Sequence, residues 1–203
     1  MRFRPTLMIA AIACGAAITS SFAADLPERQ QAEVTPATPP PVTILKPRFL
    51  SEVRFGVSAQ DPWSPEDGSV NITGEVLTGK LFQADNATLD LFIPRFHVGG
   101  SANTAGATSF AYAGFTWTVP ITSQLFVEAS FGGAIHNGKT GDNVGPNRVA
   151  LGCSPLFRES ASVGWRFDEH WSLLATIEHL SNGGLCDQNR GLTNVGARVA
   201  YSF

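Results

Sequence analysis

The sequence has few cysteines, few charges and, beyond its first residues, no long apolar run. Charged residues make up 15% of the chain and form no basic cluster, which argues against a nucleic-acid surface. After the leader, no segment has the roughly 18 consecutive apolar residues that a membrane-spanning helix needs, so a helical membrane protein is excluded. The histidines and cysteines lack metal-ligand spacing, and we expect neither a metal nor an organic cofactor.

Residues 1–23 are typical of a secretory signal peptide. Arg2 and Arg4 precede an apolar run over 7–18, and residues 21–23 form a small-x-small cleavage site. A lipoprotein cysteine at Cys14 is the alternative, but the apolar run ahead of it is short. Loss of this leader changes the formal charge of the chain from −3 to −5. The sequence therefore predicts an exported, mildly acidic protein.

The predicted export bears on how we interpret residues 24–48 and the two remaining cysteines. Residues 24–48 are rich in proline and polar residues, a composition that favours extended conformations, and we interpret them as a flexible tether. Cys153 and Cys186 are left after removal of the leader, and an even number in an exported protein suggests a single disulfide.

From Phe49 to the end of the chain, apolar and polar residues alternate in short segments. In the first, Val53 and Phe55 alternate with Glu52 and Arg54, the period of a β-strand with two different faces. The expected strands are 50–60, 69–82, 88–101, 108–119, 124–137, 151–167, 170–182 and 191–203. A soluble sandwich would turn the charged face to water, whereas a small membrane barrel would turn it into the lumen.

The carboxy-terminal strand favours the membrane barrel. Val195 to Phe203 alternate up to a terminal aromatic residue, which resembles the last strand of bacterial outer-membrane barrels. We therefore predict an all-β, eight-stranded antiparallel transmembrane barrel over residues 49–203, located in the bacterial outer membrane. The links near 62–68, 101–108, 137–148 and 182–191 would face outward, and those near 84–88, 120–123 and 168–170 inward.

The charged parity should then fill the lumen with ion pairs. Glu178 is expected to meet Arg198 there, because it lies on the opposite parity from His179. The other residues expected in lumen ion pairs are Glu52, Arg54, Arg95, Glu128, Arg158 and Arg166.

His179 and Ser181 continue the apolar parity of their strand. The preceding members of that row include Trp171, Leu173 and Ile177, so the pair should face lipid near the outer rim. Residues i and i+2 of a strand lie about 6.5–7 Å apart at Cα, and a serine hydroxyl becomes a good nucleophile when an imidazole takes its proton. The pair is a candidate catalytic dyad, and a pair that binds headgroups is the alternative.

The stretch His179-x-Ser181-Asn182-x-Gly184, followed by Asn189 and Gly191-Leu192, resembles the PagL-type lipid A deacylases. The resemblance implies that His179 is the general base and Ser181 the nucleophile for cleaving an ester-linked acyl chain. It also implies that the Gly184 backbone and Asn189 side chain stabilise the oxyanion, and that Asn182 positions the loop. The partner would be lipid A of the outer leaflet, bound by a monomer or a homodimer.

One position departs from this family. Its members carry an acidic residue shortly after the Gly-Leu pair, where this chain has Thr193-Asn194. If the turn at 168–170 places Phe167 opposite Trp171, then Glu159 faces His179 on the neighbouring strand. We predict that Glu159 orients the imidazole.

The same register has two further consequences. It places Cys186 beside Gly152, next to Cys153, so it also supports a disulfide between the two cysteines. A shift of two residues would instead bring Ala161 or Phe157 opposite the imidazole.

Two other functions share most of these features. A non-enzymatic surface barrel, structural or adhesive, has everything except the His-x-Ser-Asn stretch, and an inactive relative of the deacylases would explain the missing acid. The geometry of His179 and Ser181 separates them: side chains within hydrogen-bond reach of each other on the outer face favour the enzyme, and side chains in the lumen favour the structural barrel.

Overall fold

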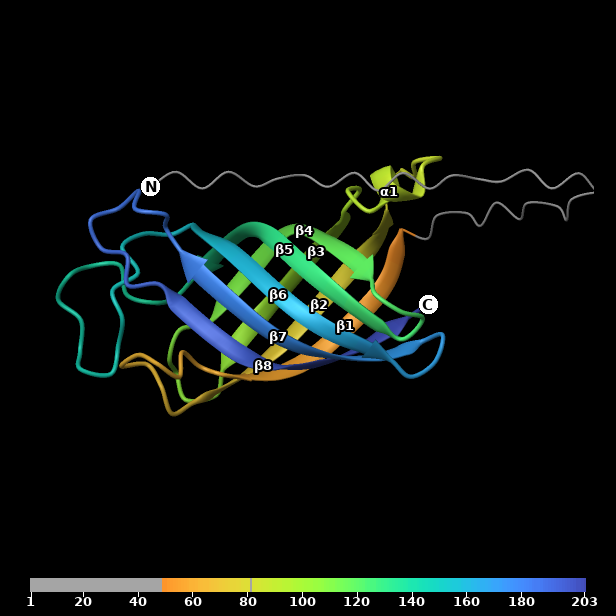
Figure 1. Cartoon of the computed structure of the whole chain (residues 1–203). Helices are drawn as coiled ribbons and strands as arrows, with labels where there is room; N and C mark the ends of the chain where they lie inside the picture. The colour runs from red at the N-terminus through yellow and green to blue at the C-terminus, as the bar shows by residue number, and fades with distance from the viewer. Residues whose placement is uncertain (1–48, 81) are drawn as a thin grey trace, which may run out of the picture. The chain divides into compact units, whose positions relative to one another are not determined.

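The computed structural model describes residues 49–80 and 82–203; the predicted signal peptide and tether lie outside them. Eight antiparallel strands form a closed barrel in which each strand pairs with the next and β8 pairs with β1 (Figure 1). The strands are β1 (Leu50–Ala59), β2 (Val70–Lys80), β3 (Arg95–Asn103), β4 (Phe110–Pro120), β5 (Leu125–His136), β6 (Leu156–Arg166), β7 (Trp171–Ser181) and β8 (Leu192–Ser202). The predicted fold is confirmed.

Two predicted strands begin too early. The segment 88–101 was expected to be extended throughout, but a short helix, α1 (Ala87–Asp90), comes first and β3 starts at Arg95. The side chain of Asn86 accepts hydrogen bonds from the N–H groups of Thr88 and Leu89 and so caps this turn. The strand expected from residue 151 starts at Leu156, because the residues before it belong to the disulfide-linked outer loops.

The two faces of the sheet have opposite polarity. Charged side chains point into the lumen and are buried; Arg54, for example, is only 3% exposed. Large apolar side chains cover the outside, an arrangement that suits contact with lipid and not with water. The exposed apolar strand residues include Phe55, Val57, Ile72, Val76, Val98, Phe115, Phe131, Ile135, Val163, Leu173, Ile177, Val195 and Val199. No helix of the described residues is both long and apolar enough to cross a membrane.

Ion pairs fill the lumen. Arg54 contacts Glu128 at 2.8 Å, and Arg198 contacts Glu178 at 3.0 Å, as predicted. A buried charge is costly to desolvate unless it is paired and hydrogen-bonded, and each of these carboxylates has more than one partner. The further pairs are Arg54 with Glu52 and Glu75, Arg95 with Glu52 and Glu128, Arg158 with Glu178, and Arg198 with Glu75. The expected ion pair of Arg166 is replaced by a stack on the ring of Phe126, 4.3 Å from its centroid.

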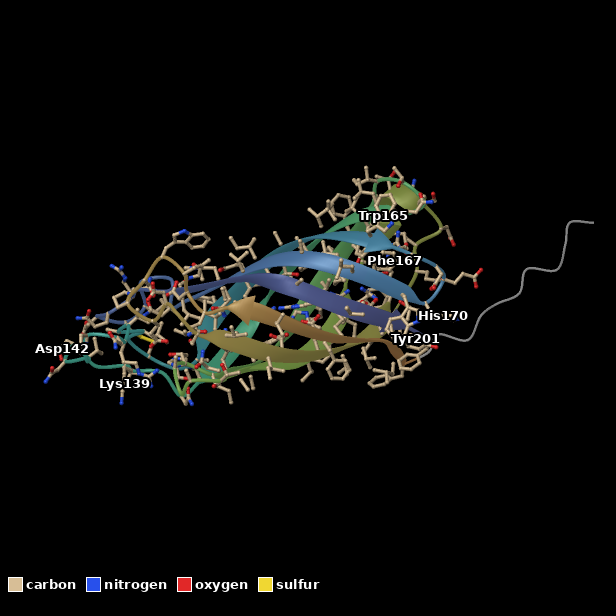
Figure 2. All side chains as sticks on the ribbon, turned by 90° about the horizontal axis from the view of Figure 1, so that it is seen from below. Lys139, Asp142, Trp165, Phe167, His170 and Tyr201 are labelled. Atoms are coloured by element: carbon tan, nitrogen blue, oxygen red, sulfur yellow. A yellow bond between two sulfur atoms is a disulfide. The ribbon has the colours of Figure 1, made fainter. Side chains whose placement is uncertain are left out.

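The two ends of the barrel differ. Figure 2 shows Trp165, Phe167, His170 and Tyr201 together at the end with the short turns, and Lys139 and Asp142 at the tip of the opposite end. Aromatic side chains at one rim are typical of the membrane–water interface. The links β1–β2, β3–β4, β5–β6 and β7–β8 all lie at the opposite end from the carboxy terminus (Figure 1), which matches the predicted division between outer loops and inner turns. The β2–β3 link, which carries α1, is longer than the β3–β4 link and is the exception to the expected difference in length.

The turn between β6 and β7 fixes the register on which the site depends. The backbone N–H groups of Trp171 and His170 donate to the Asp168 carboxylate, each at 2.8 Å, and hold the pKa of Asp168 below its usual value. The Phe167 N–H donates to the Trp171 carbonyl at 2.9 Å. From this turn the pairing runs without a shift, and the predicted register is confirmed.

Candidate active site

His179 and Ser181 lie on the outer face of β7, at its outer end. Both are partly exposed, and they alternate with buried Glu178 and Leu180. The pair therefore faces the surroundings of the barrel and not its lumen. Of the two orientations weighed from the sequence, this is the one expected of an enzyme that takes its substrate from the membrane.

A row of side chains crosses three strands at the level of His179. Glu159 on β6 and Thr193 on β8 are its two cross-strand partners. The Nδ1 atom of the imidazole lies 2.8 Å from the Thr193 hydroxyl oxygen. Glu159 is exposed and, within residues 49–80 and 82–203, makes no hydrogen bond to the imidazole. The structure thus confirms the predicted register, in which Glu159 lies opposite His179. The hydrogen bond that orients the imidazole, however, is made with Thr193 and not with Glu159.

The contact with Thr193 leaves Nε2 of His179 as the nitrogen that can serve Ser181. When the Thr193 hydroxyl accepts a hydrogen bond from Nδ1–H, Nε2 carries no hydrogen and can act as the base. Among the described side chains no hydrogen bond joins His179 to Ser181, so the expected outward orientation is found and the expected hydrogen bond is not. Such bonds are often long without substrate and shorten when the substrate is bound.

Asn182 organises the loop that follows. Its side chain is 1% exposed, and its amide nitrogen donates to the carbonyls of Leu151 at 2.9 Å and Gln188 at 2.5 Å. Its backbone N–H donates to the side-chain oxygen of Asn189 at 2.9 Å. This bond engages the amide oxygen of Asn189 and leaves its amide N–H groups free of partners within the described part of the chain.

The backbone N–H of Gly184 is already used in this loop. It donates to the side-chain oxygen of Asn182 at 2.9 Å, within a turn in which Gly184 has a positive φ of 82°. An oxyanion bound by Gly184, as the sequence predicts, would have to share or replace this bond. Of the two predicted donors, Asn189 is the one with free N–H groups.

A disulfide joins the β5–β6 and β7–β8 loops. Cys153 and Cys186 are bonded, with their Cα atoms 6.2 Å apart, and the predicted pairing is confirmed. Gly152, beside it, has a φ of 84°, and a Cβ there would lie 2.6 Å from the amide nitrogen of Asn182. The disulfide and this close contact hold the Asn189 segment beside the end of β7.

Phe157 forms an apolar wall next to Ser181. It is the cross-strand partner of Ser181, and its ring stacks on Phe131 with centroids 6.0 Å apart. Both rings are exposed on the outer face. Sequence reasoning assigned these residues no role, although the register that pairs Glu159 with His179 also pairs Phe157 with Ser181.

Thr193 is the second residue whose role the sequence did not reveal. It was noted as a departure from the family pattern and not as a partner of the imidazole. Its parity was a usable signal, because Val195 and Ala197 continue the same outward row of β8. The pairing of β7 with β8 then places Thr193 against His179.

Gly191 sets the position of the imidazole. Its φ is 70°, and a Cβ at this residue would lie 2.8 Å from Cε1 of His179, closer than the two groups can approach. We expect Gly191→Ala to displace the ring and to lower turnover by about 10- to 100-fold, since an error of about 1 Å in the position of a catalytic group has an effect of that order. The rate at which the purified barrel releases fatty acid from an acyl ester in detergent measures this turnover.

The control for this variant is Gly106→Ala. Gly106 also has a positive φ, 77°, but nothing lies within 4 Å of its ideal Cβ position, so backbone strain alone should leave turnover close to that of the unmodified protein. Equal losses in both variants would attribute the effect of Gly191→Ala to backbone strain and not to contact with the imidazole.

Comparison with known proteins adds to this geometry. The model of the lipid A 3-O-deacylase (PagL) family matches residues 51–202. No curated protein matches the chain. Among solved structures, the outer membrane enzyme PagL superposes with a TM-score of 0.58 at 18% identity, covering 74% of this chain and 98% of that one.

Two other solved barrels are less similar. A de novo designed transmembrane β-barrel has a TM-score of 0.49 at 13% identity, with 78% of this chain and 98% of that one covered. The N-terminal barrel domain of Pseudomonas aeruginosa OprF has a TM-score of 0.48 at 11% identity, with 78% and 100% covered. At 18% identity, the likeness to the PagL structure shows the fold alone.

Proposed function

Because this chain belongs to the lipid A 3-O-deacylase (PagL) family, we propose that it is an outer-membrane esterase that removes the acyl chain ester-linked at the 3-position of lipid A. The reaction would use Ser181 as nucleophile and His179 as general base. The substrate is a lipid of the outer leaflet, so it would reach the site sideways through the membrane and not through the lumen.

One observation carries this proposal: His179 and Ser181 share the outer, lipid-facing side of β7 at its outer end. A polar pair in an apolar row is costly unless it has a partner, and the ester group between a sugar and its acyl chain would be such a partner. The lumen, by contrast, is filled by ion pairs and offers no path for a lipid.

The reaction follows from the two side chains. The Ser181 hydroxyl oxygen attacks the ester carbonyl carbon while Nε2 of His179 accepts its proton. The tetrahedral intermediate collapses, the bond to the sugar oxygen breaks, and the imidazolium returns the proton to that oxygen. Water then attacks the acyl-enzyme with the imidazole again as base, which releases a fatty acid and restores Ser181.

Asn189 is the proposed oxyanion donor. The Asn182 N–H donates to the amide oxygen of Asn189, so the amide N–H groups of Asn189 remain available for an oxyanion. We expect Asn189→Ala to lower kcat by about 10²-fold with little change in KM, because an oxyanion donor acts mainly in the transition state. Kinetics of fatty-acid release from lipid A in mixed micelles tests this.

Asn137→Ala serves as the matched control for this variant. Asn137 is also an outer-loop asparagine that accepts a backbone N–H through its side-chain oxygen, from Ser109 at 2.8 Å, but it follows β5 and not β7. Loss of activity in both variants would contradict the oxyanion role. A raised KM with unchanged kcat in Asn189→Ala would contradict it as well.

The stacked rings of Phe157 and Phe131 support an acyl chain as the ligand. They lie beside Ser181 on the lipid-facing surface, where a saturated chain held against them would keep its ester near the hydroxyl. Leu185, which is 77% exposed, adds apolar surface to the β7–β8 loop.

Mass spectrometry of lipid A tests the proposed function. Purified, folded barrel is incubated with lipid A in detergent, and fragmentation then locates the lost acyl chain. We expect one free fatty acid, released from the 3-position, for each deacylated lipid. A non-enzymatic surface barrel predicts unchanged lipid A at the same concentration of folded protein, and loss of a chain from another position would place the substrate specificity outside that of the family.

A further inference from the structure

Thr193 leaves the imidazole without a negatively charged partner. Nε2 of His179 can act as a base only if Nδ1 carries a hydrogen, and that hydrogen then points at the Thr193 hydroxyl oxygen, 2.8 Å away. A hydroxyl can orient the ring, but it contributes no charge to stabilise the imidazolium that forms when Ser181 gives up its proton. A carboxylate within reach of Thr193 would supply that charge.

Asp61 lies on the other side of Thr193. It follows β1 in the outer β1–β2 loop, is 5% exposed, and its Oδ1 accepts the backbone N–H of Thr193 at 3.0 Å. Its own N–H donates to the side-chain oxygen of Asn194 at 3.2 Å. The cross-strand row of the site therefore continues onto a fourth strand end and finishes in a buried carboxylate.

The second oxygen of this carboxylate has no partner. Oδ2 of Asp61 is buried and makes no hydrogen bond within the part of the chain that the structure describes. A buried unpaired carboxylate oxygen is costly. Asp61 also has a φ of 35°, and it is the non-glycine residue with a positive φ among the described residues. Strained backbone of this kind persists where surrounding contacts enforce it, often beside functional groups.

Surrounding contacts do enforce this conformation. Gln60, the preceding residue, is fully buried and donates to the Glu66 carboxylate at 3.0 Å. Glu66 in turn accepts hydrogen bonds from Thr108 and Val149, in the next two outer loops. The segment that carries Asp61 is thus held, through Glu66, by two other outer loops.

We propose that Asp61 is a positioning residue that supplies, through Thr193, the carboxylate for His179. When Nδ1–H donates to the Thr193 oxygen, the hydroxyl hydrogen needs an acceptor of its own. Asp61 already accepts the Thr193 N–H through Oδ1, and its Oδ2 is unpaired, so a change of side-chain rotamer that brings Oδ2 to the hydroxyl completes the proposed link. The negative charge then stabilises the imidazolium without taking its proton. The proposal rests on the proposed function, because it assigns the third member of the same catalytic group.

The other carboxylates near His179 are less suited. Glu178 faces the lumen, where Arg158 and Arg198 bind it at 2.6 and 3.0 Å. Glu159 faces His179 across the strand pair but is exposed and makes no hydrogen bond to it. Within the described residues, Asp61 combines burial with a direct contact to the residue that holds the imidazole.

Kinetics of Asp61→Asn test the proposal. Asparagine keeps the oxygen that accepts the Thr193 N–H and removes the charge. We expect kcat to fall about 10- to 100-fold at unchanged KM, and the acidic limb of the kcat/KM profile to move to lower pH, because the imidazolium is no longer stabilised. Asp67→Asn, an exposed residue of the same loop, is the control and should leave both unchanged.

Thr193 provides two further variants. Thr193→Val removes the hydroxyl and should reproduce the loss and the shift, whether or not Asp61→Asn folds. Thr193→Glu places a carboxylate directly against the imidazole, and in that background Asp61→Asn should change kcat less than about two-fold, the non-additivity expected of residues that act as one unit. Folding of each variant is checked by its heat-dependent migration in gels.

The outcomes separate the proposals. If Thr193→Val keeps the rate and pH profile of the unmodified protein, the role of Asp61 is overturned. It is also overturned if Glu159→Gln moves the acidic limb and Asp61→Asn does not, and Glu159 is then the acid. If the unmodified protein itself releases no fatty acid, the proposed function fails instead.

Discussion

Ser181→Ala should abolish deacylation, with kcat/KM lowered by at least about 10³-fold, because the variant lacks the proposed nucleophile and retains only binding and oxyanion stabilisation. The loss should appear in kcat and not in KM, since the hydroxyl contributes little to binding the acyl chain. The measurement is the release of the fatty acid from the 3-position of lipid A, monitored by mass spectrometry.

The matched control is Ser172→Ala. Ser172 lies on the same strand but faces the lumen and is buried, so the change tests whether a serine-to-alanine substitution in β7 affects the barrel itself. We expect activity close to that of the unmodified protein. If Ser181→Ala retained full activity with a folded barrel, the nucleophile would lie elsewhere and the assignment of the dyad would be wrong.

His179→Gln should have an effect of similar size, about 10³-fold or more on kcat. Glutamine is close in size and can still accept a hydrogen bond, but it cannot take a proton from Ser181. The pH profile distinguishes this from a packing defect: the acidic limb produced by protonation of an essential base should be absent from the residual activity. Rates between about pH 5 and pH 8 provide the comparison.

His170→Gln is the control for this second variant. His170 lies in the inner turn before β7, where its ring stacks on Tyr201 with centroids 5.4 Å apart. Its loss should leave the rate and the pH profile unchanged. A retained acidic limb in His179→Gln would mean that another group is the base.

Both effects depend on features that local sequence pattern could predict. The period-two alternation assigns each side chain of β7 to one face, because successive residues of a strand point to opposite sides. The turn at Asp168 then fixes the register of β6 and β7, so the pairing of Glu159 with His179 could be derived without coordinates. The helix α1 was missed for the opposite reason: its start depends on the local capping bonds of Asn86, which alternation does not report.

The sequence by itself determined the exported class, the barrel, the outward-facing histidine and serine, and the disulfide. These follow from composition, from a two-residue period and from one short turn, all of which act between residues close in the chain. Only the tertiary structure decided which group holds Nδ1 of His179, which asparagine N–H groups remain free, and that a strained, buried Asp61 ends the row. The contact of Asp61 with Thr193 forms when β8 closes on β1. It joins residues 132 positions apart, a separation that no local pattern encodes. The hydrogen bonds of His179 with Thr193 and of Asn182 with Asn189 span only 14 and 7 residues, but they depend on how the β7–β8 loop is held against the other outer loops.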